Sequence, residues 1–279
     1  MSAPVASAVV RTFNSMATVA ATFASLRAQD VPVEVVVVDS GSTDGTLELA
    51  AREADQVVRL SPQEFTFGHA LNVGAEAASA PVHIGLSSHC VLPGPWYARV
   101  AAGHVADGAQ GAFGEVRDWQ GQPLEGPRRV SYDDLVQDRF WGYSGHGGTW
   151  SAAAWRREPF RADLPSSEDR EWSWRVVQDG GYLVVDPRLL VDAGHRRDAG
   201  VRSYYRRMVK EGTALLEWRP LEPYSARAAV RDLLHPAPGT QMITRSRRLG
   251  RTRAVEVAAK VAADRRQRAL RRQGRQRPS

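Results

Sequence analysis

The stretch VEVVVVDSGSTDGT, residues 33–46, indicates the type of sheet that this chain builds. Its first six residues are five valines and Glu34, with no alternation of polar and apolar side chains. Such a run is typical of a strand that is buried on both faces, as in a parallel sheet. Asp39 ends the run, and a small polar loop follows it. Because open α/β sheets bind ligands at the carboxyl ends of their strands, this loop is the first candidate for a binding site.

Strand-like and helix-like segments alternate on both sides of this stretch. Predicted strands cover residues 5–11, 33–38, 56–60 and 81–87, and predicted helices cover residues 16–29, 46–54 and 70–78. This alternation predicts an α/β fold with a Rossmann-like, mostly parallel central sheet flanked by helices.

The pattern is less regular after residue 110. Predicted strands cover residues 112–117, 182–185 and 189–191, and predicted helices cover residues 132–140, 168–178 and 202–216. Residues 118–150 are rich in Gly, Pro, Trp and Tyr, and residues 251–272 have a helical composition. We therefore expect an irregular second half and a basic C-terminal helical extension.

The net charge of +6 is unevenly distributed. Residues 245–279 contain 13 Lys and Arg side chains and two acids, a net charge of +11, so the rest of the chain carries −5. The basic balance therefore belongs to the tail and says little about what the body binds. Two interpretations of the tail stay open, a solvated or disordered extension and a helix that lies on anionic lipid. We expect no nucleic-acid partner, since no base-reading motif accompanies the charge.

The single cysteine, Cys90, excludes an internal disulfide framework and a four-cysteine zinc site. No apolar run reaches the length of a membrane span, and the N-terminus lacks the basic start of a signal peptide. The expected location is the cytoplasm, with peripheral contact at the inner membrane face as an open alternative.

Four segments together resemble the motifs of family 2 glycosyltransferases of the GT-A fold. They are VVRTFNS (9–15), VVVVDSGSTDGT (35–46), EFTFGHALNVGAEAASA (64–80) and PSSEDREWSWRV (165–176). The resemblance covers roughly residues 7–215. It implies transfer of a sugar from a nucleotide-diphosphate sugar to an acceptor hydroxyl, with inversion at the anomeric carbon. The acceptor class, a glycan, a lipid-linked molecule or a small molecule, stays open.

The same resemblance implies a division of the chain. Residues 1–220 would form the GT-A domain, with a nucleotide-sugar-binding half (1–110) and an acceptor half (111–220), and residues 221–279 would form the basic extension. The aromatic segment at residues 142–155 would border the acceptor site. Trp141, Tyr143, Trp150 and Trp155 could stack on a sugar there or belong to the core.

For the donor, the resemblance implies a set of contacts at the ends of the first strands. Thr12, Asn14 and Asp39 would line the nucleoside pocket, with Ser40 and Asp44 nearby and Asn72 close to the diphosphate or ribose. The competing interpretation of the polar loop is a tight turn in which Asp44 or Thr46 caps the next helix.

Glu168 and Asp169 open a predicted helix after a Pro-Ser-Ser turn. Adjacent residues at a helix start diverge by about 100°, so the two carboxylates can serve different partners. The family carries its general base on the Asp of this pair, which implies Asp169 as the base and Glu168 as an acceptor-orienting group. The alternative is that both acids only offset the helix dipole.

The family usually ends its fourth strand in an Asp-x-Asp string whose last Asp binds the metal that carries the diphosphate. Here Ser87, Ser88 and His89 stand in that place. Ser88 and His89 would contact the donor, and His89 could bind Mn²⁺ through a neutral imidazole, whereas Mg²⁺ prefers oxygen. His195 would be the second metal ligand.

Two alternatives to a metal at His89 stay open. His89 could donate directly to the diphosphate, with Arg11, Arg202 or Arg206 as cations, or it could only pack. The missing acids at 87 and 89 also leave open a catalytically inactive nucleotide-sugar-binding protein. A protein that acts on nucleic acid or membrane through its tail is the remaining rival.

Overall fold

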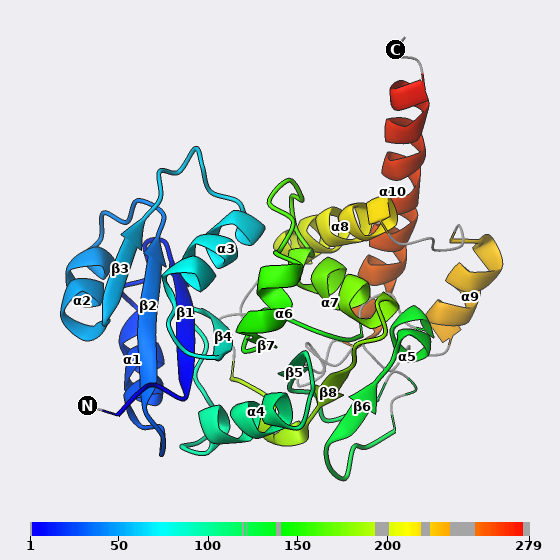
Figure 1. The fold of residues 1–279 in the computed structure, drawn as a ribbon. Coiled ribbons are helices and arrows are strands. Elements are labelled where there is room, and N and C mark those ends of the chain that lie inside the picture. The colour runs from blue at the N-terminus through cyan, green and yellow to red at the C-terminus, as the bar shows by residue number, and fades with distance from the viewer. Residues whose placement is uncertain are drawn as a thin grey trace.

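The computed structural model describes residues 2–118, 120, 122–137, 141–192, 201–218, 224–234 and 249–275. A sheet of eight strands runs through this part of the chain in the order β3-β2-β1-β4-β7-β5-β8-β6. Four of the strand pairings are parallel and three are antiparallel. Helices pack on both faces of the sheet (Figure 1). The predicted α/β fold with a mostly parallel sheet is therefore confirmed.

The first half of the chain is the regular half. Its strands are β1 (Ala6–Thr12), β2 (Val33–Asp39), β3 (Gln56–Arg59) and β4 (Val82–Ser87). Its helices are α1 (Val19–Arg27), α2 (Thr46–Glu53), α3 (Phe67–Ala77) and α4 (Tyr97–Ala106). All four strands are parallel, so their carboxyl ends meet at one edge of the sheet.

Short strands characterise the second half. They are β5 (Gly111–Phe113), β6 (Arg128–Val130), β7 (Thr149–Ser151) and β8 (Leu183–Val185). The helices are α5 (Tyr132–Gln137), α6 (Ala152–Arg157), α7 (Glu168–Gln178), the 3₁₀ turn η1 (Pro187–Leu189), α8 (Val201–Trp218), α9 (Ala226–Leu234) and α10 (Leu249–Arg275). β7 runs antiparallel between β4 and β5 and so joins the two halves into one sheet.

Strand β1 shows how the sheet separates two apolar cores. Val10 packs in a cluster with Phe23 of α1, whereas its neighbour Val9 packs in a cluster with Leu71 of α3 and Trp150 of β7. Both faces of the strand are fully buried. The valine run of β2 is buried in the same way from residue 35 onward, which is why its sequence shows no polar alternation.

Helix α10 packs against α8 (Figure 1). Ala259 and Ala263 are buried, and a Cβ on Gly212 of α8 would lie 3.0 Å from the Cβ of Ala263. Tyr204 and Glu256 form a hydrogen bond between the two helices. The described part of this basic segment is therefore helical and packs on α8 around residues 259–264, whereas most of its described residues from 265 onward are exposed to solvent. In the part of the chain that the structure describes, no helix has the length and apolar character needed to cross a membrane.

The prediction of a strand over residues 189–191 is wrong. Residues 187–189 form the 3₁₀ turn η1, because Pro187 starts a turn and the Asp186 carboxylate accepts from the backbone N–H of Arg188 at 2.9 Å. The strand predicted over residues 112–117 ends already at Phe113. The helix predicted over residues 70–78 begins earlier, at Phe67, because Thr66 caps it by accepting from the N–H of His69.

Candidate active site

The candidate site lies where β1, β2 and β4 end. In the sheet register Thr12 stands opposite Asp39 and Arg11 stands opposite Ser87. The backbone N–H and the hydroxyl of Ser40 both donate to the carbonyl of Thr12 at 3.1 Å. The ends of three neighbouring strands are thus held together, as expected for the ligand edge of an open sheet.

The carboxylate of Asp39 organises the polar loop. Its Oδ1 accepts from the N–H groups of Gly41 (3.0 Å) and Ser42 (2.8 Å), and its Oδ2 accepts from the hydroxyls of Thr12 and Ser42, each at 2.6 Å. Burial alone would raise the pKa of Asp39, but these four hydrogen bonds lower it below its usual value. Asp39 is therefore ionised and fixes the loop backbone. Its predicted place in a nucleoside pocket stays a prediction.

Asn14 and Asp44 tie the loop after β1 to the loop after β2. Asn14 has a positive φ of 45° and its Oδ1 accepts from the N–H of Thr43 at 2.8 Å. Asp44 accepts from the N–H of Met16 at 3.0 Å and from the hydroxyl of Thr46 at 2.6 Å. The cap position of α2 itself is Gly45, with no side-chain cap bond. The side chains of Asn14 and Asp44 are both exposed, beside the predicted nucleoside pocket.

Ser88 and His89 follow β4 directly. The hydroxyl of Ser88 donates to that of Ser15 at 2.6 Å, and its carbonyl accepts from Thr18. The ring of His89 lies 6.1 Å from the ring of His146, centroid to centroid. A contact at 3.1 Å joins Nδ1 of His146 to the hydroxyl of Ser144. The structure therefore brings a second imidazole, which the sequence analysis did not single out, next to His89.

Glu168 and Asp169 begin α7 beside these strand ends. Oδ2 of Asp169 accepts from the backbone N–H of Gly145 at 2.6 Å, and Oδ1 accepts from the N–H of Arg170 at 2.8 Å. Glu168 is only 5% exposed and forms an ion pair with Arg11 at 3.5 Å. As predicted from the helix geometry, the two carboxylates have different partners.

Burial raises the pKa of Glu168 to about 7. The neighbouring charge of Asp169 adds to the increase in pKa, and the cations Arg11 and Lys210 oppose it. The Glu168 carboxyl is therefore less acidic than an ordinary glutamate, as is common for carboxyl groups at functional sites.

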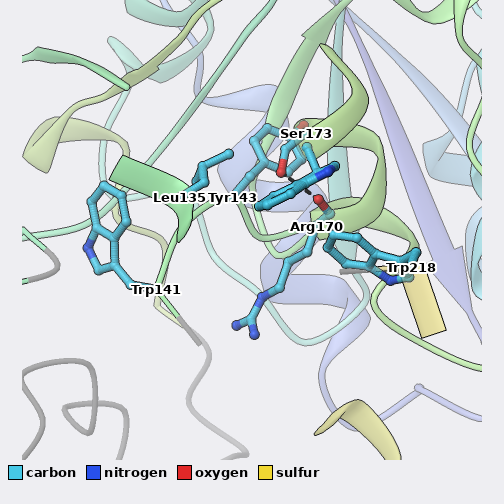
Figure 2. A pocket seen from close by; sticks show the side chains of 7 residues that line it. Leu135, Trp141, Tyr143, Arg170, Ser173 and Trp218 are labelled. Atoms are coloured by element: carbon cyan, nitrogen blue, oxygen red, sulfur yellow. Dashed lines mark hydrogen bonds between the residues drawn. The ribbon is translucent and has the colours of Figure 1, made fainter. Parts of the chain in front are cut away.

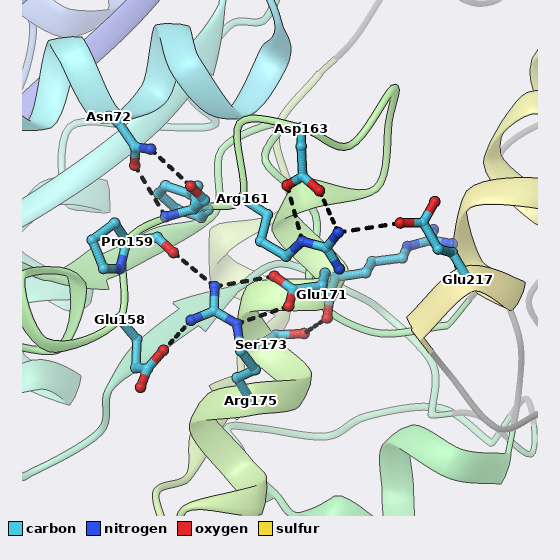
Figure 3. Close-up of polar contacts among 11 residues, drawn as sticks. Asn72, Glu158, Pro159, Arg161, Asp163, Glu171, Ser173, Arg175 and Glu217 are labelled. Atoms are coloured by element: carbon cyan, nitrogen blue, oxygen red, sulfur yellow. Dashed lines mark hydrogen bonds and ion pairs between the residues drawn. The ribbon is translucent and has the colours of Figure 1, made fainter. Parts of the chain in front are cut away.

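Asn72 lies in α3 and connects that helix to the segment after α6 (Figure 3). Its Nδ2 donates to the carbonyl of Phe160 at 2.7 Å, and its Oδ1 accepts from the N–H of Phe160 at 3.0 Å and from the indole Nε1 of Trp155 at 2.9 Å. These bonds use the amide for internal structure. The expected contact with the diphosphate or ribose stays a prediction.

The same segment is held from α7 by Arg175. Its guanidinium donates to both carboxylate oxygens of Glu171 at 2.8 and 3.0 Å and to the carbonyl of Pro159 at 2.7 Å (Figure 3). Glu171 is 3% exposed, so the buried carboxylate has a bidentate partner. Asn72 of α3 and Arg175 of α7 thus both bind the short segment at Pro159 and Phe160.

The four aromatic residues proposed for acceptor stacking are all in the core. Trp150 and Tyr143 are at most 1% exposed, and Trp141 and Trp155 are 5% and 6% exposed. A small hollow that is partly open to solvent lies beside the start of α7 (Figure 2). It is lined by Leu135, Trp141, Tyr143, Arg170, Ser173, Trp174 and Trp218. Trp150 and Trp155 are covered by other side chains, which agrees with the core interpretation. Stacking of a sugar on Trp141 or Tyr143, which line the hollow, stays a prediction.

A metal ion would find few protein ligands in this site. In the described ranges no group of three or more His, Cys, Asp or Glu side chains is placed to hold a metal. His89 and His146 are two imidazoles of the kind that Mn²⁺ accepts. His195, the predicted second ligand, lies outside the described residues. The described residues therefore supply two imidazoles at this position, and the metal site itself stays a prediction.

Solved structures that share this fold include the following three. A mannosyltransferase from Pyrobaculum calidifontis, solved with GDP-Man and Mn²⁺, is 18% identical, with a TM-score of 0.66 over 95% of this chain and 87% of that chain. S. aureus TarS 1–349 with UDP-GlcNAc is 18% identical, with a TM-score of 0.55 over 96% and 92%. Glucosyl-3-phosphoglycerate synthase from Mycobacterium tuberculosis, with Mn²⁺, UDP and its product, is 20% identical, with a TM-score of 0.54 over 78% and 81%. The fold is thus that of GT-A glycosyltransferases.

The sequence profile described as Glycosyl transferase family 2 matches residues 7–164, which is more than half of the chain. The chain therefore belongs to glycosyl transferase family 2, and it is a glycosyltransferase. No curated protein sequence matches it.

Proposed function

We propose that this glycosyltransferase moves a sugar from a nucleotide-diphosphate sugar to an acceptor hydroxyl, with inversion and with Asp169 as the general base. The observation that carries the proposal is the position of the Asp169 carboxylate. It lies at the start of α7, held by the N–H of Gly145, and Gly145 also contacts Arg11 at the end of β1. A base at this point lies next to the strand ends where an open sheet binds its ligand.

The reaction does not require a strong base at this position. The acceptor hydroxyl loses its proton only as it bonds to the anomeric carbon, so an ordinary carboxylate suffices. Two hydrogen bonds fix the carboxylate and leave further lone pairs for the hydroxyl. Inversion is part of the proposal because a single base and a direct displacement need no covalent intermediate on the enzyme.

The donor would lie against the loop that Asp39 organises, with Thr12, Asn14, Ser40 and Asp44 around the nucleoside. Ser88 and His89 would face the diphosphate. A divalent ion, with Mn²⁺ preferred for an imidazole ligand, would neutralise the leaving group when bound there. His89 and His146 are the described side chains that would hold it.

The test replaces Asp169 by Asn, which keeps the size of the side chain and removes its basicity. Loss of a general base lowers the rate by about 10²- to 10⁴-fold. We expect this loss of transfer with donor affinity retained, measured as thermal stabilisation by a panel of UDP-, GDP- and dTDP-sugars. Asp179→Asn, at the exposed end of the same helix, is the control. A near-native transfer rate in Asp169→Asn would falsify the base assignment.

A further inference from the structure

Arg11 places a buried guanidinium between the donor edge and the start of α7. The side chain is 8% exposed although it stands at the end of β1. Its Nη2 donates to the hydroxyl of Ser87 at 3.5 Å and to the carbonyl of Gly145 at 3.4 Å, and its Nη1 lies 3.5 Å from Oε1 of Glu168. One cation therefore joins β1, β4, the Gly145 loop and α7.

Gly145 relates this cation to the proposed base. Its carbonyl accepts from Arg11 and its N–H donates to Asp169. A Cβ on Gly145 would lie 3.2 Å from Oδ2 of Asp169 and 3.7 Å from Nη2 of Arg11. Both side chains therefore bind the backbone of the same residue, and a shift of Arg11 would move Asp169 through Gly145.

Arg11 is also linked to the proposed base through Glu168, which precedes Asp169 in α7. A buried carboxylate is stable as an ion only with a compensating charge. The charged groups that act on Glu168 are Asp169 in the same helix, Arg11 in β1 and Lys210 in α8. Arg11 is buried, whereas Lys210 is exposed. Arg11 is therefore the cation that compensates the Glu168 charge inside the protein.

We propose that Arg11 is a positioning residue for the Glu168–Asp169 pair, holding the first turn of α7 and the Gly145 loop in register with the strand ends. The proposal rests on the proposed function, since it takes Asp169 as the base. A planar guanidinium can reach the carboxylate and the carbonyl at the same time, whereas an ammonium group has no such fork. Ser87 accepts a hydrogen bond from the guanidinium but carries no negative charge. Ser87 therefore does not compete with Glu168 for the ion pair with Arg11.

The experiment compares Arg11→Met and Arg11→Lys with a control, Arg99→Met, whose guanidinium is exposed and pairs with Asp30. A small misplacement of a reacting group can cost about 10²-fold in rate. We expect kcat to fall by about 10- to 100-fold in Arg11→Met and at least about threefold in Arg11→Lys. The KM for the donor should change by less than about twofold, because the loss lies in the base and not in donor binding.

The decisive readout is the double variant with Asp169→Asn. If Arg11 acts through Asp169, Arg11→Met adds no further loss of kcat once the base is removed. An additive loss, a loss confined to the donor KM, or a native kcat in Arg11→Met would overturn the proposal. If Arg11→Met does not fold, Arg11→Lys is judged by the same criteria. An active Asp169→Asn variant would instead refute the base assignment, so the two failures are distinguishable.

Discussion

Replacing Asn72 by Ala tests whether this amide serves the fold. The substitution removes three hydrogen bonds, two to the backbone of Phe160 and one from the indole of Trp155. Trp155 is 6% exposed and Phe160 is 3% exposed. The variant therefore leaves an indole N–H, a backbone N–H and a carbonyl with little access to water.

Each buried polar group left without a partner costs roughly 1–3 kcal/mol. Asn72 itself is partly exposed, so water can reach part of the gap, and we expect a loss of about 3 kcal/mol in the free energy of unfolding. For a domain of this size that corresponds to a decrease in Tm of roughly 6–12 °C. Urea denaturation followed by tryptophan fluorescence measures the loss directly.

The matched control is Gln178→Ala, which removes an amide from the exposed end of α7 and should change the stability by less than about 0.5 kcal/mol. Donor affinity, measured below the unfolding transition, separates the two roles of Asn72. A stability loss below 1 kcal/mol, together with donor binding weakened about tenfold, would refute the hydrogen-bond argument. It would support the donor contact that the sequence motif predicts.

Two further predictions concern protons and metal. Burial lowers the pKa of His83 to about 4, so its neutral form is favoured on folding; the resulting stability is present above pH 6.5 and is lost as the pH falls toward 4. In His83→Phe the urea midpoint should fall less steeply with decreasing pH than in the unchanged protein. Parallel curves of urea midpoint against pH for the two proteins would contradict the assignment. Chelation with EDTA should lower transfer and Mn²⁺ should restore it; full activity in EDTA would favour direct contact of His89 with the diphosphate.

The first half of the fold could be predicted because its signals are local. The valine run of residues 33–38 and the alternation around it specify buried parallel strands without any knowledge of their partners. The second half could not be predicted in this way. The three residues of β7 carry no period of their own, and β7 is a strand only because β4 and β5 lie on either side of it.

The site shows the same limit. The motif at residues 168–169 was sufficient to place a carboxylate at the start of a helix, because its signal is local. The role of Gly145 depends on two residues that are far from it in the chain, Arg11 and Asp169, so no pattern around residue 145 could have indicated it. Asn72 belongs to a motif that suggested a ligand contact, and its bonds to Phe160 depend on a segment 88 residues away.

The packing of α10 on α8 has a consequence for synthesis. Chains fold from the N-terminus as they emerge, and α8 is made before the segment that covers it. Until Ala263 has emerged, the face of α8 around Gly212 lacks its neighbour. Met208 and Leu215, which are buried in the finished structure, lie in the same helix. The nascent protein can complete its central sheet early, but α8, the helix that brings Lys210 toward Glu168, reaches its final surroundings only after α10 has been made.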